Sequence, residues 1–335
     1  MTLSTPQSVS QTPWGAPCRP DGDRPLVLEP VYCCLCDVDD GEPIAVGEDF
    51  EYRTSPDTFL AMSCRRCGLV YLNPRPALSE LSRIYPPDYH AYDFSAEQFG
   101  LVYRVRQRLE AQRLLAYCRG LGPQARILDV GCGDGFHLDL LRRFGQPGWQ
   151  LEGVDPSDLA VRAARHEGLT IHQGTIQDLD LPTASYDLAL MIATLEHVDH
   201  PTVVLARVRS LLRPGGRVVI VTDNTDTLDF HWFRQRHWGG YHFPRHWTLF
   251  NPATLRRLAQ KTDLEVEALT TIVSPVNWVY SIRNTLVDWG APPWLVAQFS
   301  LRSTFALGIF TLFDIIHQKL GHGALIRAVL RRPIS

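Results

Sequence analysis

The sequence lacks three features that would place it in a protein class at once. Its formal net charge of −3 gives no basic surplus of the kind that nucleic-acid-binding domains usually carry. No uninterrupted apolar run reaches the roughly 18 to 20 residues that a membrane-spanning helix needs. The segment Met1–Ser10 is polar and lacks the charged-then-apolar layout of a signal peptide. We therefore expect a cytoplasmic protein in a reducing compartment, with nucleic acid disfavoured as a partner.

The bulk composition is that of a globular protein with a large core. Hydrophobic residues make up 45% and charged residues 21% of the 335 residues, a length that suits two domains or one domain with additions. Residues 1–30 are rich in Pro, Ser, Thr and Gln, and we expect a disordered tail there because they cannot bury enough apolar surface. Residues 76–122 are predicted to form a proline-rich linker and then a helix over about Ser95–Cys118.

Four of the eight cysteines form two C-x-x-C pairs within residues 31–75, Cys33 with Cys36 and Cys64 with Cys67. In a reducing compartment, paired cysteines more often hold a metal than form disulfides. A two-residue spacer lets both thiolates of a pair reach one tetrahedral ion, so the two pairs predict a closed, structural Zn²⁺ site. Cys34 lies between the first two ligands and is not expected to bind. Buried thiols or a redox pair are the alternatives that the spacing leaves open.

From residue 125 onward, short apolar strands alternate with helical segments, which is the pattern of an α/β protein with a parallel sheet. We expect residues 123–335 to form one domain, with a helical insertion over 273–322 before the last strand. The seven predicted strands are Arg126–Val130, Gln150–Val154, Leu169–His172, Leu188–Ile192, Arg217–Val221, Glu265–Leu269 and Leu325–Leu330.

A glycine-rich turn follows the first of these strands and precedes a helix predicted over Phe136–Phe144. Its three glycines form the pattern G-x-G-x-G, whereas a dinucleotide-binding fingerprint would have a glycine where Phe136 stands. The tighter turn suits a nucleoside ligand that has no pyrophosphate. Asp155 lies 24 residues beyond Gly131 at the end of the second strand, where an acid can accept hydrogen bonds from both ribose hydroxyls.

The segment Asp129–Gly135 resembles the first motif of class I S-adenosylmethionine-dependent methyltransferases, and later segments up to Leu211–Gly216 resemble further motifs of that family in order. The resemblance implies a Rossmann-like seven-stranded sheet with S-adenosylmethionine as cofactor. It also implies that Asp155 binds the ribose, that Ile176 packs on the adenine and that Thr194–Val198 lines the methionine end. The cofactor-binding residues implied in this way are Asp129, Gly131, Cys132, Gly133, Gly135, Asp155, Pro156, Ile176, Gln177 and Thr194. An α/β domain that binds another nucleotide is the alternative.

The segment 231–247, after the fifth strand, holds four of the 12 histidines and three of the eight tryptophans. The ligand crevice of an open α/β sheet lies beyond the carboxyl ends of the strands, where this segment belongs. Its aromatic residues are expected to stack on an acceptor, and its imidazoles can remove a proton near neutral pH. We predict His246 as the general base, with His242 orienting the acceptor; Arg245, beside it, hints at an anionic acceptor. Packing tryptophans and a His246 that only bonds loop backbone are the alternatives.

The cysteine pairs together with Leu69–Pro74 resemble a bacterial group of methyltransferases with an N-terminal zinc-binding module, to which sugar methyltransferases belong. This resemblance implies methyl transfer to a hydroxyl or carbon of a small-molecule, sugar or glycan-linked acceptor. A thinner resemblance, carried by Leu195–Val198, is to quinone-pathway O-methyltransferases. An RNA methyltransferase whose zinc module binds RNA, and a non-enzymatic cofactor-binding subunit, are further alternatives.

The insertion over 273–322 contains three tryptophans but no apolar run long enough to cross a bilayer. It is compatible with a peripheral membrane contact, with a cover over a lipid-linked acceptor, and with a buried helix pair or a dimer contact.

Overall fold

The computed structural model describes residues 24–334, apart from 87–88, 90–95 and 167. The tail predicted over residues 1–30 thus lies mostly outside the described residues. Its last part is ordered, because Leu26 is buried and β1 (Leu28–Glu29) pairs with β5 (Arg75–Pro76).

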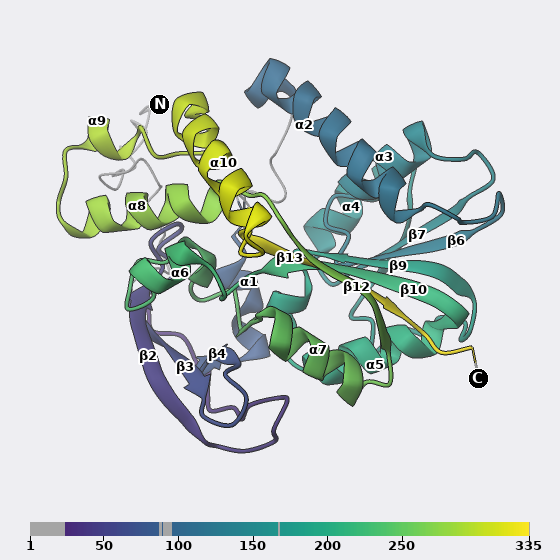
Figure 1. Ribbon diagram of the computed structural model, residues 1–335, viewed down its shortest axis with the longest axis horizontal. Coiled ribbons are helices and arrows are strands. Elements are labelled where there is room, and N and C mark those ends of the chain that lie inside the picture. Colours follow the sequence, from purple (N-terminus) through teal and green to yellow (C-terminus); the bar gives the residue numbers. More distant parts are fainter. Residues whose placement is uncertain (1–23, 87–88, 90–95, 167, 335) are drawn as a thin grey trace, which may run out of the picture.

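The centre of the molecule is a seven-stranded mixed sheet in the order β12-β13-β10-β9-β6-β7-β8 (Figure 1). The strands β6 to β10 run parallel, and β13 is antiparallel to both of its neighbours. The sheet confirms the predicted fold, and all seven predicted strands are present. Their bounds are β6 (Arg126–Val130), β7 (Gln150–Asp155), β8 (Thr170–Gln173), β9 (Tyr186–Ile192), β10 (Leu212–Asp223), β12 (Glu265–Ile272) and β13 (Leu325–Arg331).

Helices cover both faces of this sheet, as the near-continuous apolar strands require. On one face Ile127 and Leu188 pack with residues of α2 and α3, and on the other Leu128 and Ala189 pack with residues of α5 and α7. Successive side chains of a strand point to opposite faces, so each strand feeds both layers. The helices are α2 (Ala96–Tyr117), α3 (Phe136–Phe144), α4 (Asp158–His166), α5 (Pro201–Leu211) and α7 (Pro252–Lys261).

The N-terminal cysteine region is built on a second, four-stranded sheet in the order β11-β4-β3-β2. Three of its strands come from the N-terminal region: β2 (Gly41–Glu48), β3 (Thr58–Cys64) and β4 (Val70–Leu72). The fourth, β11 (Thr248–Leu249), comes from the chain that follows the segment 231–247 and pairs with β4. The short helices η1 (Leu78–Glu80) and α1 (Leu81–Ile84) follow this region. The small sheet is therefore completed by a strand from the domain that contains the large sheet, which sequence reasoning did not foresee.

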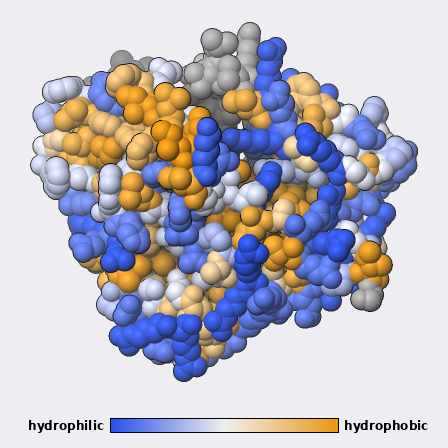
Figure 2. Space-filling model, viewed as in Figure 1, coloured by the Kyte–Doolittle hydropathy of each residue, from blue (hydrophilic) through white to orange (hydrophobic). Residues whose placement is uncertain are grey.

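The helical insertion lies between β12 and β13 and consists of α8 (Val276–Asp288), α9 (Pro293–Val296) and α10 (Thr304–Lys319). Hydrophobic residues gather on the molecular surface over these helices (Figure 2). No helix of the described residues is both long and apolar enough to cross a membrane.

A fully buried ion pair joins the N-terminal region to the segment 231–247. Arg245 donates through Nη1 and Nη2 to the two carboxylate oxygens of Asp49, at 3.2 and 2.8 Å. The guanidinium also donates to the carbonyls of Ile84 and Phe243. Burial raises the pKa of Asp49, but the facing Arg245 charge outweighs it and holds this pKa at about 2. The expectation that Arg245 marks an anionic acceptor is therefore wrong, because its side chain is 0% exposed and already pairs with Asp49.

We expect Arg245→Ala to lower the free energy of unfolding by about 3 to 5 kcal/mol, because it leaves the Asp49 carboxylate buried without its partner. Urea unfolding at pH 7, followed by tryptophan fluorescence, measures the loss. The matched control is Arg65→Ala, which removes an exposed arginine paired with Asp40 and Glu42 and should cost less than about 1 kcal/mol. Equal losses in the two variants would contradict the assigned role of the buried pair.

Candidate functional site

The glycine-rich turn between β6 and α3 has the backbone shape that its sequence predicts. Gly131, Gly133 and Gly135 all have positive φ angles, of 73°, 54° and 82°, which residues with a Cβ rarely adopt. A Cβ at Gly131 would lie 2.5 Å from Thr194 Cγ2, and one at Gly135 would lie 2.4 Å from Leu169 Cδ1. A Cβ at Gly133 would meet nothing within 4 Å, so the turn is open above this residue.

Two acids lie beneath this turn at the carboxyl ends of β6 and β7. Asp155 accepts hydrogen bonds from the backbone N–H of Gly133 at 2.9 Å and of Ser157 at 2.8 Å, and burial raises its pKa. Asp129 is buried, and its Oδ2 has no hydrogen-bond partner among the described residues, although His137 Nδ1 lies 3.7 Å away. An unsatisfied buried carboxylate oxygen is costly, so this position fits a ligand that donates a hydrogen bond.

The remaining predicted cofactor-binding residues lie around the same turn. They differ in their exposure to solvent. Cys132 is buried beside the turn, whereas Pro156 is exposed. Thr194 is buried and donates its hydroxyl to the Val130 carbonyl at 3.0 Å, which ties the end of β9 to β6. Gln177 donates to Asp199 at 3.4 Å. Ile176 is 3% exposed within the core, so it presents little surface to a ligand.

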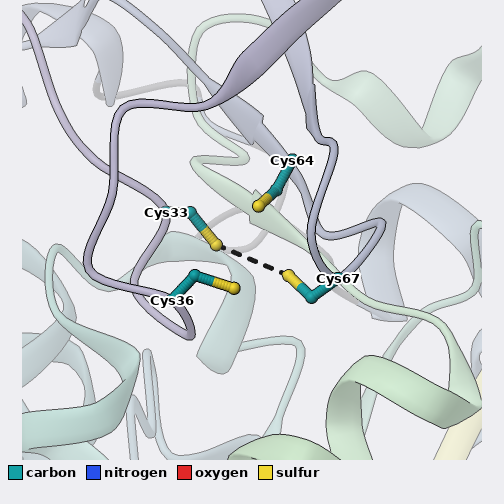
Figure 3. Close-up of side chains that lie close together, drawn as sticks. All are labelled: Cys33, Cys36, Cys64 and Cys67. Carbon is teal, nitrogen blue, oxygen red and sulfur yellow. Dashed lines mark hydrogen bonds between the residues drawn. The ribbon is translucent and has the colours of Figure 1, made fainter.

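The four predicted metal ligands come together in the N-terminal region (Figure 3). Cys33, Cys36, Cys64 and Cys67 bring their sulfur atoms within 4.8 Å of one another, and Cys33 Sγ lies 3.5 Å from Cys67 Sγ. Cys34 is not part of this group.

The two cysteine pairs have the same backbone geometry. In each, the backbone N–H of the residue four positions after the first cysteine donates a hydrogen bond to the carbonyl oxygen of that cysteine. Asp37 N–H donates to the Cys33 carbonyl, and Gly68 N–H to the Cys64 carbonyl, both at 2.8 Å. Asp37 and Gly68 both have positive φ angles. Burial raises the pKa of Cys33 to about 11, although N–H groups of Leu35 and Cys36 donate to its sulfur. Burial also raises the pKa of Cys67, and four converging thiols of which two disfavour the bare thiolate fit a metal ion that supplies the compensating charge.

Three histidines form a second cluster at the carboxyl end of the large sheet. His197 belongs to η2 (Leu195–His197), while His242 and His246 come from the segment 231–247. The His246 ring centroid lies 4.6 Å from that of His197 and 5.0 Å from that of His242. The structure thus brings together both predicted catalytic histidines and adds His197, which the sequence analysis placed in the segment Thr194–Val198 without a catalytic role.

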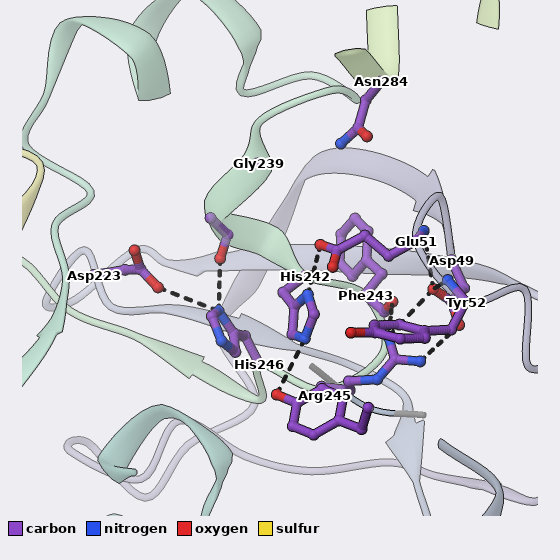
Figure 4. Close-up of polar contacts among 12 residues, drawn as sticks. Asp49, Glu51, Tyr52, Asp223, Gly239, His242, Phe243, Arg245, His246 and Asn284 are labelled. Atoms are coloured by element: carbon purple, nitrogen blue, oxygen red, sulfur yellow. Dashed lines mark hydrogen bonds and ion pairs between the residues drawn. The ribbon is translucent and has the colours of Figure 1, made fainter. Parts of the chain in front are cut away.

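The hydrogen bonds of His246 define its tautomer (Figure 4). Its Nδ1 lies 2.8 Å from the carbonyl oxygen of Gly240, which can only accept a hydrogen bond, so Nδ1 carries the proton. The lone pair is then on Nε2. Burial and the neighbouring imidazoles of His197 and His242 hold the pKa of His246 well below its usual range. The ring is therefore neutral at pH 7 and can accept a proton through Nε2.

Two buried acids to which the sequence analysis gave no catalytic role lie next to His246. Asp223, at the end of β10, has Oδ2 3.4 Å from His246 Nδ1 and accepts a hydrogen bond at 2.7 Å from Asn277 of α8. Burial raises the pKa of Asp223 to about 6, and burial together with the Asp223 charge raises that of Glu196 to about 8. Glu196, His197 and His246 also bring donor atoms within 4.8 Å of one another, an arrangement that can hold a metal ion.

His242 is held between residues from the N-terminal part of the chain. Its Nδ1 lies 2.6 Å from Glu51 Oε1, and its Nε2 lies 3.3 Å from the hydroxyl of Tyr89. A carboxylate accepts, so Nδ1–H donates to Glu51 and Nε2 faces the tyrosine hydroxyl. Both ring nitrogens are thus engaged, which suits a positioning role better than proton transfer. The sequence around Glu51 is acidic, but no motif there indicated that this residue belongs to the site.

The aromatic residues of the segment 231–247 do not form the stacking surface that was expected. Trp238, Tyr241, Phe243 and Trp247 are buried in a cluster with residues of the small sheet. They pack the segment against the N-terminal region, and burial of such large rings stabilises this junction. Trp232, by contrast, is exposed.

Comparisons with known proteins agree with this architecture. A family model described as a methyltransferase domain matches residues 103–269. The ubiquinone biosynthesis O-methyltransferase of Cereibacter sphaeroides is 30% identical over 174 residues, which are 48% of this chain and 68% of that protein. A 37.1 kDa protein from transposon TN4556 of Streptomyces fradiae is 35% identical over 111 residues, so the match spans 32% of this chain and only 32% of that relative.

One solved structure was also found to be similar. The geranyl diphosphate C-methyltransferase of Streptomyces coelicolor A3(2) superposes with a TM-score of 0.48 at 15% identity, over 74% of this chain and 86% of that chain. The family match, the glycine-rich turn and the order of the sheet make S-adenosylmethionine the cofactor. The chain belongs to the class I S-adenosylmethionine-dependent methyltransferases.

Proposed function

We propose that this methyltransferase acts on a hydroxyl or carbon of a small-molecule, sugar or glycan-linked acceptor, with His246 as the general base. The observation that carries the proposal is the bond between His246 Nδ1 and the Gly240 carbonyl, which leaves Nε2 as the basic nitrogen. S-adenosylmethionine supplies a methyl group on a positively charged sulfur. His246 Nε2 would take the proton that the acceptor loses as its bond to the methyl carbon forms, while His242 orients the acceptor.

A short series of contacts links the proposed base to the cofactor turn. Thr194 packs against Gly131, and η2 follows Thr194 directly. The backbone N–H of Trp247 donates to the Glu196 carbonyl at 2.8 Å, which holds His246 beside η2. This arrangement supports transfer at close range, because holding the reacting groups together supplies much of the rate gain in such reactions.

For the cofactor, we assign the ribose hydroxyls to Asp155 and a donor group of the ligand to the open Oδ2 of Asp129. Gly131, Cys132, Gly133, Gly135, Pro156, Gln177 and Thr194 would form the rest of the pocket. Because the Ile176 side chain is buried, we expect the cofactor to contact mainly the surface of the loop that carries it.

A quinone-like phenol is the second candidate acceptor, since the Cereibacter relative is a ubiquinone biosynthesis O-methyltransferase. The geometry does not favour RNA. Arg65 and Arg66, the exposed arginines beside the second cysteine pair, form ion pairs with Asp40 and Glu42. These arginines therefore offer little uncompensated charge for phosphate groups.

We expect His246→Ala to lower kcat about 100- to 10,000-fold while the affinity for S-adenosylmethionine stays within about twofold, because only the proton acceptor is lost. Turnover is measured with labelled cofactor and the acceptor fraction of a cell extract, and affinity by calorimetry. The exposed His231 of the same segment provides the control variant His231→Ala. In the unmodified protein the acidic limb of kcat should lie below pH 6.5, since the pKa of His246 is lowered. A variant that keeps more than about a tenth of the turnover would exclude His246 as the base.

The Asp155→Asn change should weaken cofactor binding roughly 30- to 1000-fold, because it removes a charge-assisted contact to the ribose worth about 2 to 4 kcal/mol. Asparagine keeps the size of the side chain and an oxygen for one of the two N–H groups that donate to Asp155. Asp158→Asn alters an exposed acid three residues away and should leave the affinity unchanged. Calorimetry decides, and unaltered affinity in the Asp155 variant would remove Asp155 from the ribose site.

One zinc ion per chain is expected at the four-cysteine cluster, where it would be structural because all four positions are filled by protein. Elemental analysis should show one equivalent in the unmodified protein and in Cys34→Ser, and much less in Cys36→Ser. The loss should destabilise the small sheet, because metal binding contributes free energy of folding directly. Zinc-free native protein, or equal zinc in both variants, would refute this site.

A further inference from the structure

Helix α10 has two apolar faces, of which only one is used inside the protein. Its inner face packs on α8, where Phe310 stacks on Trp278 at 5.7 Å between ring centroids and Phe313 meets the same ring edge-on at 5.0 Å. Ala306 and Asp314 on this side are buried. The inner face alone therefore accounts for the attachment of the helix to the molecule.

The outer face of α10 carries an exposed stripe of large apolar side chains. The members follow one another at intervals of four, three, four and four residues, which keeps them on one side of a helix over roughly 22 Å. Their exposed fractions range from 47% to 76%. They are Phe305, Ile309, Leu312, Ile316 and Leu320.

Two tryptophans extend the apolar surface beyond α10. Trp289, just after α8, is 76% exposed, and Trp294 in α9 is 68% exposed. Figure 2 shows hydrophobic residues gathered over this part of the molecule, where Figure 1 places α8, α9 and α10. Tryptophan side chains favour the boundary between an apolar phase and water. A contiguous exposed patch of this kind marks an interaction surface.

The charges of the insertion indicate what this surface contacts. Both of its acids have partners within the protein. Asp288 is exposed and pairs with Arg236 and His237, and Asp314 is buried and accepts from the backbone N–H groups of Ser274 and Ala324. Its exposed charged side chains near the ends of α10 are Arg302 and Lys319. The exposed charged residues of the insertion that flank the apolar stripe are thus both basic.

We propose that the outer face of α10, with Trp289 and Trp294, docks on an anionic phospholipid bilayer. Basic side chains that flank an apolar helix face match a negatively charged lipid surface, with the apolar groups inserted among the acyl chains and the cations at the headgroups. A second copy of the chain would bring the same positive charges against one another, which disfavours self-association through this face. At 16 residues, α10 is too short to cross the bilayer and lies on it instead.

The position of α8 connects this docking surface to the methyl-transfer site. The same helix that supports α10 through Trp278 also carries Asn277, which donates to Asp223 beside His246. Docking through α10 would therefore hold the site close to the lipid surface. The docking proposal does not depend on the identity of the acceptor.

Co-sedimentation with vesicles tests the proposal on the full chain. The protein should bind vesicles of equal parts phosphatidylglycerol and phosphatidylcholine, and bind vesicles of phosphatidylcholine alone at least tenfold more weakly. The variant Phe305→Ser/Leu312→Ser/Ile316→Ser should lose binding by more than tenfold, with its affinity for S-adenosylmethionine retained. The control Leu78→Ser/Leu109→Ser/Val203→Ser removes three exposed apolar side chains elsewhere, each slightly more than half exposed, and should bind like the unmodified protein.

A separate variant tests the contribution of the basic side chains to vesicle binding. Arg302→Gln/Lys319→Gln should weaken binding to the anionic vesicles about fivefold per charge and reduce its sensitivity to salt. Absence of binding to anionic vesicles, or equal binding by the triple serine variant and its control, would overturn the proposal. So would light scattering that shows a dimer which the triple serine variant alone converts to a monomer, because the face would then belong to a second copy.

Discussion

The buried pair of Arg245 and Asp49 is the contact on which the histidine site depends. Arg245 lies between His242 and His246 in the sequence, and Asp49 lies two residues before Glu51, which holds His242. A guanidinium and a carboxylate without exposure to water are stable only while they face each other and their remaining hydrogen-bonding groups are satisfied. The pair therefore holds two segments, distant in sequence, in one relative position, and both histidines follow from it.

This arrangement gives the N-terminal region a structural part in the site. Its small sheet is completed by β11, which begins two residues after His246, and its loop supplies Asp49 and Glu51. The opposite end of the region, with the four cysteines, packs on the core beneath α7, where Lys261 donates to the Cys34 carbonyl at 3.0 Å. A metal ion at the cysteines would thus stabilise a sheet that packs against the segment carrying His242 and His246.

The large sheet could be predicted because its strands and turns are determined by residues that are close together in the sequence. Neighbouring strand residues such as Ile127 and Leu128 pack on opposite faces of the sheet, and the apolar runs in the sequence indicate these strands. The glycines that adopt positive φ angles also stand out in the sequence. The partners of the histidines could not be predicted in this way. Glu51 and His242 are 191 positions apart in the sequence, and neither segment contains a pattern that indicates the hydrogen bond between them. The aromatic residues of 231–247 were expected at a ligand surface, but the same composition also suits a buried junction, and burial prevailed.

A crystal structure with S-adenosylhomocysteine bound tests the central claim most directly, because it locates the sulfur that carries the methyl group relative to His246. The account predicts that the sulfur lies above the glycine-rich turn, within about 8 Å of His246 Nε2, with Nε2 open to the space between them, since a base must reach its proton directly or through one water. A sulfur farther away, or a His246 whose Nε2 is bonded to protein and turned from the cofactor, would contradict the account.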